Sequence, residues 1–344
     1  TFNKNEGEIL TDNIKDLSTL IKRSTNLLKE FVIYGEINEV KPVDLMATYH
    51  VFLQEVLLLK LNSLVNRYPM KTKNICLVGG CALNIKWNNA IRNSGMFKDV
   101  WVPPFPNDSG SAIGAACSEM VKYTDKLALE WDVYSGPFLN EYEENNSWAS
   151  VDCSIPELAR VIHDFDEPII FLNGRAELGP RALGNRSILS APVSNTMKGK
   201  LNKIKGREDY RPVAPICLVE DAPEIFSPGT PDPYMLYDHK VREEWLNKIP
   251  AITHLDGTAR LQTVSSNSNP EIYALLQEYK SLSGVPLLCN TSANHSGRGF
   301  FPDVQSVMDW GKVNAIWSKG KVYVRKDSRI FAESELFKLV EKSF

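Results

Sequence analysis

Nine basic residues and three acidic ones lie between Phe171 and Arg211, so this stretch carries +6 in a chain whose formal charge is −3. Its arginines stand in two blocks, 179–187 (GPRALGNRS) and 203–212 (KIKGREDYRP). They are embedded among Gly, Pro, Ala and Leu and do not follow a polar helix face. Guanidinium groups bind phosphate through paired hydrogen bonds, and Lys supplies a compact charge. The pattern favours a desolvated anion pocket over a solvated charge run.

A later arginine, in the stretch 256–262 (DGTARLQ), adds a further cation to this set. The candidate phosphate-binding side chains are Arg181, Arg186, Lys205, Arg207, Arg211 and Arg260.

Polar residues follow a predicted strand at 285–289, in the segment 290–297 (NTSANHSG). Hydroxyl and amide groups at the end of a strand can hydrogen-bond phosphate and ribose oxygens, which makes Asn290, Ser292 and Asn294 candidates. The alternative is a polar turn whose side chains cap the backbone. His295 alone is better explained as a turn residue than as a ligand.

Two further candidates follow predicted strands in the first third of the chain. Gly79 and Gly80 begin the motif GGCALN, where glycines allow a sharp turn. The start of the following helix, with Asn84, offers polar groups to a ligand. A plain tight turn explains the two glycines equally well. Asp108, in PNDSGS, can hold a divalent cation at a sheet edge, although the local sequence favours a helix cap.

The pattern of apolar residues predicts an α/β protein in which these motifs sit at element ends. In the first part, helical periodicity covers 17–31 and 45–65. A continuous apolar run then predicts a buried parallel strand at 74–78. The remaining elements expected there are a helix at 83–92, a strand at 100–102 and a helix at 110–122.

The second part is expected to hold a helix at 155–165, a strand at 168–172, and an irregular, Pro-rich middle at 206–264. Towards its end it has helices at 270–283 and 302–310 and strands at 285–289 and near Ile316 and Val322. These patterns give a domain at 1–130, a linker at 131–151 and a second domain at 152–344.

The composition, with 43% hydrophobic and 24% charged residues over 344 positions, excludes a disordered chain. The apolar run Val56–Leu61 is too short for a membrane span, and no secretory signal is visible. Six cysteines without a C-x-x-C pair indicate buried, reduced thiols and a cytoplasmic protein. Five histidines lack metal-binding spacing, and a charge near zero gives no reason to expect a nucleic-acid surface.

Taken together, the motifs resemble the O-carbamoyltransferases of natural-product pathways, a family that includes nodulation-factor, cephem and aminoglycoside carbamoyltransferases. The resemblance covers most of residues 41–310 and keeps the family's order. The stretches that carry it are GGCALN, PPFPNDSGSAIGAA, ELGPRALGNRSIL, LNKIKGREDYRPVAP, ITHLDGTARLQTV and GVPLLCNTSANHSG.

The resemblance implies a partial actin/hexokinase-type ATPase lobe, similar to the threonylcarbamoyl-transferase subunit, followed by a YrdC-like α/β domain. Such enzymes make carbamoyl-adenylate from carbamoyl phosphate and ATP, then transfer carbamoyl to a hydroxyl of a small-molecule acceptor. Carried over by position, Arg181, Arg211 and Arg260 hold phosphates, and the adenylate is surrounded by Lys205, Arg207, Asn290, Ser292 and Asn294. Gly80 and Asn84 contact adenosine in the first lobe, and Asp108 binds a divalent metal of the Mg, Mn or Fe type.

The family's first lobe carries a phosphate loop and an H-x-x-x-H metal motif, and nothing before Asp44 supplies either. The chain is therefore expected to be the C-terminal portion of the enzyme. Ala293 stands where the family has an aromatic residue. The alternatives are a tRNA threonylcarbamoylation enzyme and a nucleotide-binding module without chemistry. Neither a nucleic-acid nor a membrane partner is expected, and homodimerisation stays open.

Overall fold

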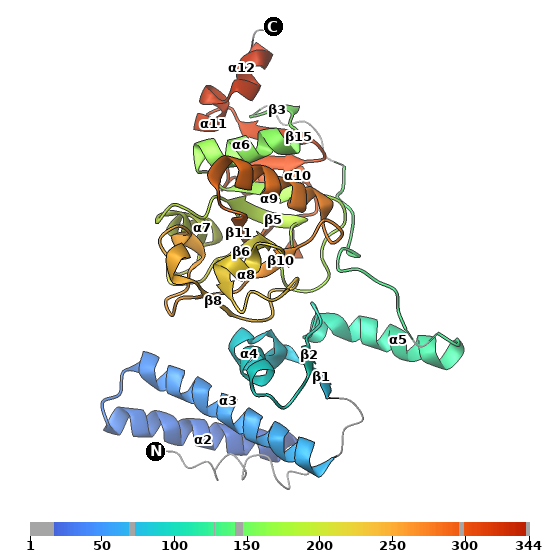
Figure 1. The fold of residues 1–344 in the computed structure, drawn as a ribbon, viewed down its shortest axis with the longest axis vertical. Helices are drawn as coiled ribbons and strands as arrows, with labels where there is room; N and C mark the ends of the chain where they lie inside the picture. Colours follow the sequence, from blue (N-terminus) through green and yellow to red (C-terminus); the bar gives the residue numbers. More distant parts are fainter. Residues whose placement is uncertain (1–16, 69–72, 127, 142–146, 296–298, 342–344) are drawn as a thin grey trace. The chain divides into compact units, whose positions relative to one another are not determined.

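A computed structural model describes residues 17–68, 73–126, 128–141, 147–295 and 299–341. The chain separates into two compact units, both visible in Figure 1: Thr1–Cys76 with Lys86–Trp101, and Leu77–Ile85 with Val102–Phe344.

The first unit contains a helical hairpin and a small parallel sheet. Helices α2 (Leu17–Ile37) and α3 (Pro42–Arg67) confirm the periodicity of their sequences, and they meet where the rings of Phe31 and Tyr49 lie 5.2 Å apart. Strands β1 (Asn74–Cys76) and β2 (Asp99–Trp101) pair in parallel, and α4 (Ile85–Asn93) lies between them in the chain.

Two expectations about this region are wrong. The strand predicted as buried over 74–78 ends at Cys76, and Val78 is 70% exposed. Cys76 and Cys81 are exposed as well, in contrast to Cys153, Cys217 and Cys289, which are buried. The reason is that β1 pairs with β2 alone in a two-stranded sheet, so this short apolar run lacks the cover that a larger sheet provides.

The second unit begins with short elements and a long helix. Two 3₁₀ turns, η1 (Gly80–Leu83) and η2 (Asp108–Gly110), precede α5 (Ser111–Tyr123), which confirms the helix expected at 110–122. No residue of α5 is buried.

The body of this unit is a mixed eight-stranded sheet of order β10-β6-β11-β5-β4-β14-β15-β3. Only the pairs β10–β6 and β4–β14 are parallel, and the other neighbours are antiparallel. The protein is therefore a mixed α/β structure. The strands are β3 (Trp148–Asp152), β4 (Ile169–Leu172), β5 (Arg186–Ser190), β6 (Ala214–Leu218), β10 (Gln262–Val264), β11 (Leu287–Ser292), β14 (Ala315–Ser318) and β15 (Lys321–Arg325).

Helices cover this sheet and close its core. α6 (Ile155–Phe165) starts with a capping box between Ser154 and Glu157, and it packs beside α9 (Pro270–Ser283), as Figure 1 shows. The further helices are α7 (Met197–Lys205), α8 (Ala222–Ile225), α10 (Val304–Trp310), α11 (Arg329–Glu333) and α12 (Glu335–Glu341). Short pieces complete the unit: β7 (Phe226–Ser227), β8 (His239–Val241), η3 (Glu243–Trp245), η4 (Pro250–Ile252), β9 (Thr258–Ala259), β12 (Asn294–His295) and β13 (Gly299–Phe300).

The segment expected to be irregular contains one of the sheet's inner strands. All five residues of β6 are buried, and the strand pairs with β10 on one side and β11 on the other. Pro215 lies inside it, opposite Cys289, and a proline usually argues against an inner strand. For that reason the sequence pattern predicted an irregular segment here and missed the strand. No helix of the described residues is long and apolar enough to cross a membrane.

Candidate functional site

Three arginines from separate segments of the second unit come close enough to influence one another. Arg181 lies in the loop between β4 and β5, Arg207 follows α7, and Arg260 joins β9 to β10. Burial lowers the pKa of Arg260 to about 9, and the positive charges of Arg181 and Arg207 add to this shift while Asp232 opposes it. Burial likewise lowers the pKa of Arg181 and of Arg207.

Two of these guanidinium groups hold buried donors that are not used. The Nε atoms of Arg181 and Arg260 are buried and have no hydrogen-bond partner among the described residues. Buried N–H groups in native proteins are almost always paired, and a cluster of desolvated positive charges costs free energy in the absence of an anion. The cluster is therefore arranged for an anionic ligand.

Lys205 connects the basic segment to the polar segment after β11. As the last residue of α7, it donates from Nζ to the backbone carbonyl oxygens of Ser292 (2.8 Å) and Asn294 (3.3 Å), and also to the side-chain oxygen of Asn294. The Ser292 hydroxyl donates to the same Asn294 oxygen at 2.6 Å. Burial lowers the pKa of Lys205 to about 8, with further lowering by Arg207 and Lys312.

A cavity of about 480 Å³ opens beside Lys205, within the size range of small-molecule sites. The predicted residues Ser292 and Asn294 line it, and so do Trp310 and Lys312, which the sequence reasoning missed. The Lys312 ammonium lies 5.6 Å from the centre of the Trp310 ring. No local motif surrounds these two residues, so only the end of α10 brings them to the cavity.

Glu177 holds the loop between β4 and β5 by hydrogen bonds from its inner side; we call this loop, which carries Arg181, the arginine loop. In the sequence analysis Glu177 counted only as one of three acidic residues. Its Oε1 accepts the backbone N–H groups of Leu183 (2.6 Å), Asn185 (2.9 Å) and Arg186 (3.2 Å). Its Oε2 is buried without a partner in the described chain, and burial raises the pKa of this carboxyl. Gly184, at φ +128°, provides the backbone conformation that the inward-turned loop needs.

Arg186 and Asn290 were both predicted to bind a ligand, but in the structure their side chains form hydrogen bonds within and around this loop. Arg186 is buried, and its guanidinium donates to carbonyl oxygens of four neighbouring residues: Pro137, Asn173, Gly174 and Asn185. The Asn290 amide donates to Ala182 O (3.0 Å) and Gln262 Oε1 (2.8 Å). In these contacts both side chains support the loop that carries Arg181.

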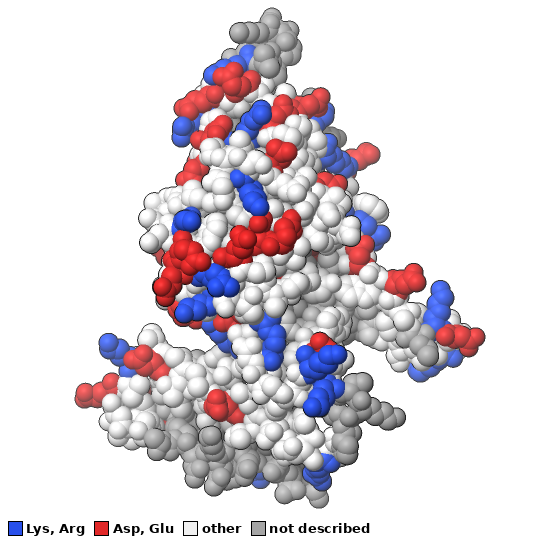
Figure 2. Space-filling view, viewed as in Figure 1, with Lys and Arg blue, Asp and Glu red and all other residues white. Residues whose placement is uncertain are grey.

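Arg211 lies at the rim of the cluster. Its side chain is 54% exposed and bonds Glu208 at 3.2 Å, while its charge lowers the pKa of Arg207. Arg181, Arg207 and Arg260 are therefore desolvated by burial, whereas Arg211 is exposed to solvent. On the face drawn in Figure 2, acidic and basic side chains are interspersed over the second unit, so the excess charge of residues 171–211 does not form a uniform basic patch there.

The two early motifs lie against each other within the second unit. Gly79, at φ +96°, donates its N–H to the carbonyl oxygen of Pro106 at 2.7 Å. Gly80 is the first residue of η1, and Asn84 is its C-cap. A side chain on Gly179 would meet Pro104 O at 2.2 Å, so the arginine loop packs on the segment that leads to Asp108. These backbone contacts bring GGCALN, PPFPNDSG and GPRALGN together.

Asp108 is exposed at the start of η2, and the side-chain cap that the local sequence favours is not formed at η2 or α5. A carboxylate in this position is free to bind a cation. It is a single ligand, however, since no group of three His, Cys, Asp or Glu residues gathers anywhere in the described ranges. The described residues therefore do not form a complete metal site.

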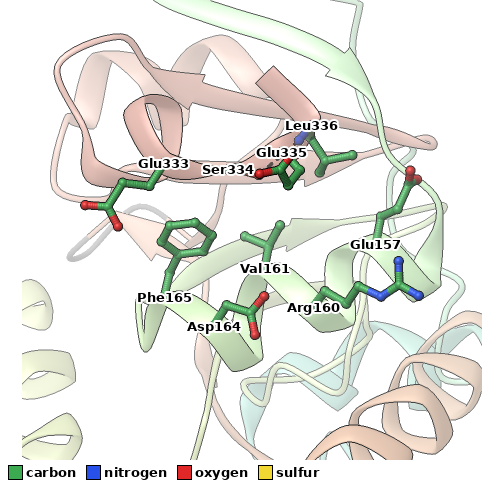
Figure 3. Close-up of a pocket in the computed structure, with 9 residues that line it drawn as sticks. All are labelled: Glu157, Arg160, Val161, Asp164, Phe165, Glu333, Ser334, Glu335 and Leu336. Carbon is green, nitrogen blue, oxygen red and sulfur yellow. Dashed lines mark hydrogen bonds between the residues drawn. The ribbon is translucent and has the colours of Figure 1, made fainter. Parts of the chain in front are cut away.

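A separate cavity of about 310 Å³ lies between α6 and the last two helices, shown in Figure 3. Val161 and Phe165 point from α6 towards residues 334–336, and carboxylates such as Glu157 and Glu333 surround this apolar floor. Glu157 is engaged in the capping box and Glu333 in an ion pair with Arg329. None of the predicted site residues lines this cavity.

Comparison with known proteins gives two matches, to the N-terminal and the C-terminal part of one family. The description "Carbamoyltransferase N-terminus" fits residues 4–117, and "Carbamoyltransferase C-terminus" fits residues 161–316. Nodulation protein U of Bradyrhizobium diazoefficiens is 56% identical over 291 residues, which cover 83% of this chain and 51% of that protein. The 3'-hydroxymethylcephem-O-carbamoyltransferase of Streptomyces clavuligerus is 41% identical over 240 residues, or 68% of this chain and 46% of that protein.

The chain spans about half the length of the curated relatives that it matches. The C-terminal match contains Arg181, Lys205, Arg207, Arg260 and the polar segment after β11. The N-terminal match contains the early glycine and aspartate motifs. On these two matches, the chain belongs to the carbamoyltransferase family.

Proposed function

We propose that this chain activates carbamoyl phosphate with ATP, forming carbamoyl-adenylate as part of an O-carbamoyltransferase that modifies a hydroxyl of a small-molecule acceptor. The observation that carries the proposal is the group of Arg181, Arg207 and Arg260: all three are desolvated, Arg260 is repelled by the other two, and Arg181 and Arg260 have unused buried donors. A relative that is named a cephem O-carbamoyltransferase supports transfer to an oxygen.

The proposed reaction brings two polyanions close together, so their repulsion has to be offset. Arg181 and Arg260 would hold the phosphate of carbamoyl phosphate while a water molecule attacks and the bond between phosphate and the carbamoyl group breaks, which gives carbamate and phosphate. The carbamate oxygen would then attack the α-phosphorus of ATP, and the bond to pyrophosphate would break. Arg207 and Lys205 would stabilise the charge on the attacked phosphoryl group and on the leaving pyrophosphate.

The cavity beside Lys205 would provide neutral contacts for the adenylate. Ser292 and Asn294 line it next to Lys205, and their hydroxyl and amide groups suit ribose and phosphate oxygens. On this proposal, residues 152–344 form the YrdC-like activating domain, and residues 1–130 are part of an actin/hexokinase-type transferase lobe. Gly79, Gly80 and Asn84 would then contact the adenosine of the adenylate in that lobe. Asp108 would supply one ligand to a divalent metal, to which no step is assigned.

Pyrophosphate release from ATP and carbamoyl phosphate by this chain tests the proposal. We expect release that depends on both substrates and a strongly raised requirement for carbamoyl phosphate in Arg181→Ala. Arg160→Ala removes the same charge from an exposed position in α6, so it serves as the matched control. ATP binding without pyrophosphate release in a folded sample would indicate a nucleotide-binding module instead. Unchanged kinetics in Arg181→Ala would remove that residue from the site.

A further inference from the structure

A third cavity in the second unit has a different chemical character. It measures about 430 Å³ and lies where β10 meets the segments before β3 and β8. Three aromatic rings line it, from Trp131, Tyr134 and Tyr234, together with the carboxylate of Asp132 and the amide of Asn267. None of the lining residues belongs to the arginine cluster or to the polar segment after β11.

The charge in this cavity is negative. Asp132 is its only charged lining residue, and neither Lys nor Arg contributes to the wall. Burial raises the pKa of Tyr234, and the negative charge of Asp132 adds to the shift. Burial also raises the pKa of Tyr134, and Glu177 and Asp132 both add to it. A phosphate or carboxylate would meet repulsion here without a compensating cation.

The walls are fixed by bonds to the protein interior. The Tyr134 hydroxyl and the Gln262 amide both donate to the carbonyl oxygen of Leu183, at 2.9 Å and 2.7 Å. Asp132 accepts the backbone N–H of Tyr134, which orients its carboxylate. These bonds hold the side chains of the wall in place, which lowers the entropic cost of binding.

Other polar groups of the wall remain available to a ligand. In the described parts of the chain, the indole N–H of Trp131, the hydroxyl of Tyr234 and the amide of Asn267 have no hydrogen-bond partner. Asp132 likewise forms no ion pair there. Aromatic faces with one unpaired carboxylate, and with few other polar groups, match what an organic ammonium ion requires: ring faces attract it, and the carboxylate neutralises it.

We propose that this cavity, lined by Trp131, Asp132, Tyr134 and Tyr234, binds a small organic cation whose ammonium group lies between the rings and the Asp132 carboxylate. The site is separate from the proposed carbamoyl-activating site. An uncharged hydroxylated ring such as a sugar would use the same amide and hydroxyl groups but would gain nothing from the unpaired charge.

Choline and its uncharged isostere 3,3-dimethyl-1-butanol test the proposal on this chain, with calorimetry or chemical-shift titration as the readout. We expect saturable choline binding that is at least about tenfold tighter than binding of the alcohol. Asp132→Asn keeps an oxygen for the Tyr134 N–H but removes the charge, so choline affinity should fall about tenfold. Arg181→Ala should leave choline binding unchanged, because the two sites share no lining residue.

Equal affinity for choline and the alcohol would overturn the proposal, as would saturable binding of glucose in place of choline. The absence of saturable choline binding to a folded chain would overturn it too. If Asp132→Asn bound choline as tightly as the unmodified chain, the cation would bind elsewhere and the proposal would be wrong. A thermal unfolding curve of each variant confirms that the comparison is made between folded proteins.

Discussion

The ammonium nitrogen of Lys205 lies 2.8 Å from the carbonyl oxygen of Ser292, although 87 residues separate the two along the chain. This contact joins the C-terminal end of α7 to the end of β11. It places Lys205, from the charged motif, beside Ser292 and Asn294, from the polar motif, on the wall of one cavity. The first prediction concerns the charge that Lys205 contributes there.

Lys205→Met keeps most of the aliphatic side chain and removes the charge. We expect the affinity for ATP, measured by calorimetry, to fall about tenfold, because a charge-assisted contact of roughly 1.5–3 kcal/mol is lost. Lys203→Met is the matched control, since Lys203 is an exposed residue of the same helix. Equal affinities of the two variants would place Lys205 outside the nucleotide site.

Anion binding at this site should weaken as the pH rises. Lys205, with a pKa of about 8, loses its proton first, and Arg260, with a pKa of about 9, follows. Sulfate keeps a constant charge over this range, so its calorimetric affinity reports on the protein alone. We expect a fall of up to about tenfold per pH unit above pH 8.

Lys205→Arg provides the check on this interpretation, because a guanidinium at this position stays charged when the ammonium would not. Its sulfate affinity should be flat until the pH approaches the range of Arg260. A flat profile in the unmodified chain between pH 7 and pH 10 would contradict the assignment of both groups to the anion site.

Arg181→Ala should weaken anion binding without lowering the free energy of unfolding. The substitution removes a desolvated charge that Arg260 repels, and it takes away a buried Nε without a partner in the described chain. We therefore expect an unchanged or slightly higher free energy of unfolding, by up to about 1 kcal/mol, together with weaker binding of inorganic phosphate. Denaturant titration and calorimetry measure the two quantities. A large loss of stability would mean that Arg181 is a structural residue.

Glu177 should behave in the opposite way, as a structural carboxylate. Glu177→Ala leaves three backbone N–H groups without their acceptor, and at about 1–3 kcal/mol each the free energy of unfolding should fall by at least about 3 kcal/mol. Glu177→Gln keeps an acceptor oxygen, so its loss should be much smaller. Denaturant titration of both variants checks this difference.

The pH dependence of these variants gives a second measurement. Because burial raises the pKa of Glu177, its contribution to stability is fully present below the unfolded value of 4.5 and is lost as the pH rises through the folded value. Glu177→Gln lacks this loss, so its stability relative to the unmodified chain should improve from acidic to neutral pH. A constant difference would show that folding does not shift the pKa of this carboxyl.

The sequence by itself determined the family and most element positions. The order of the local motifs needed no coordinates, and the helices α6 and α9 have the boundaries that their apolar periodicity predicts. Helical and strand periods are local properties of the chain, and so are the glycines at turns such as Gly79. The local density of arginines likewise indicated an anion site without a fold.

Tertiary structure decided which of the cations are free for a ligand. Arg181 and Arg186 stand in the same motif, yet the second is bonded to four carbonyl oxygens while the first keeps an unused buried donor. Glu177, Trp310 and the inner strand β6 also escaped the sequence reasoning. Burial, desolvation and hydrogen-bond partners arise between segments far apart in the chain, so no local pattern encodes them.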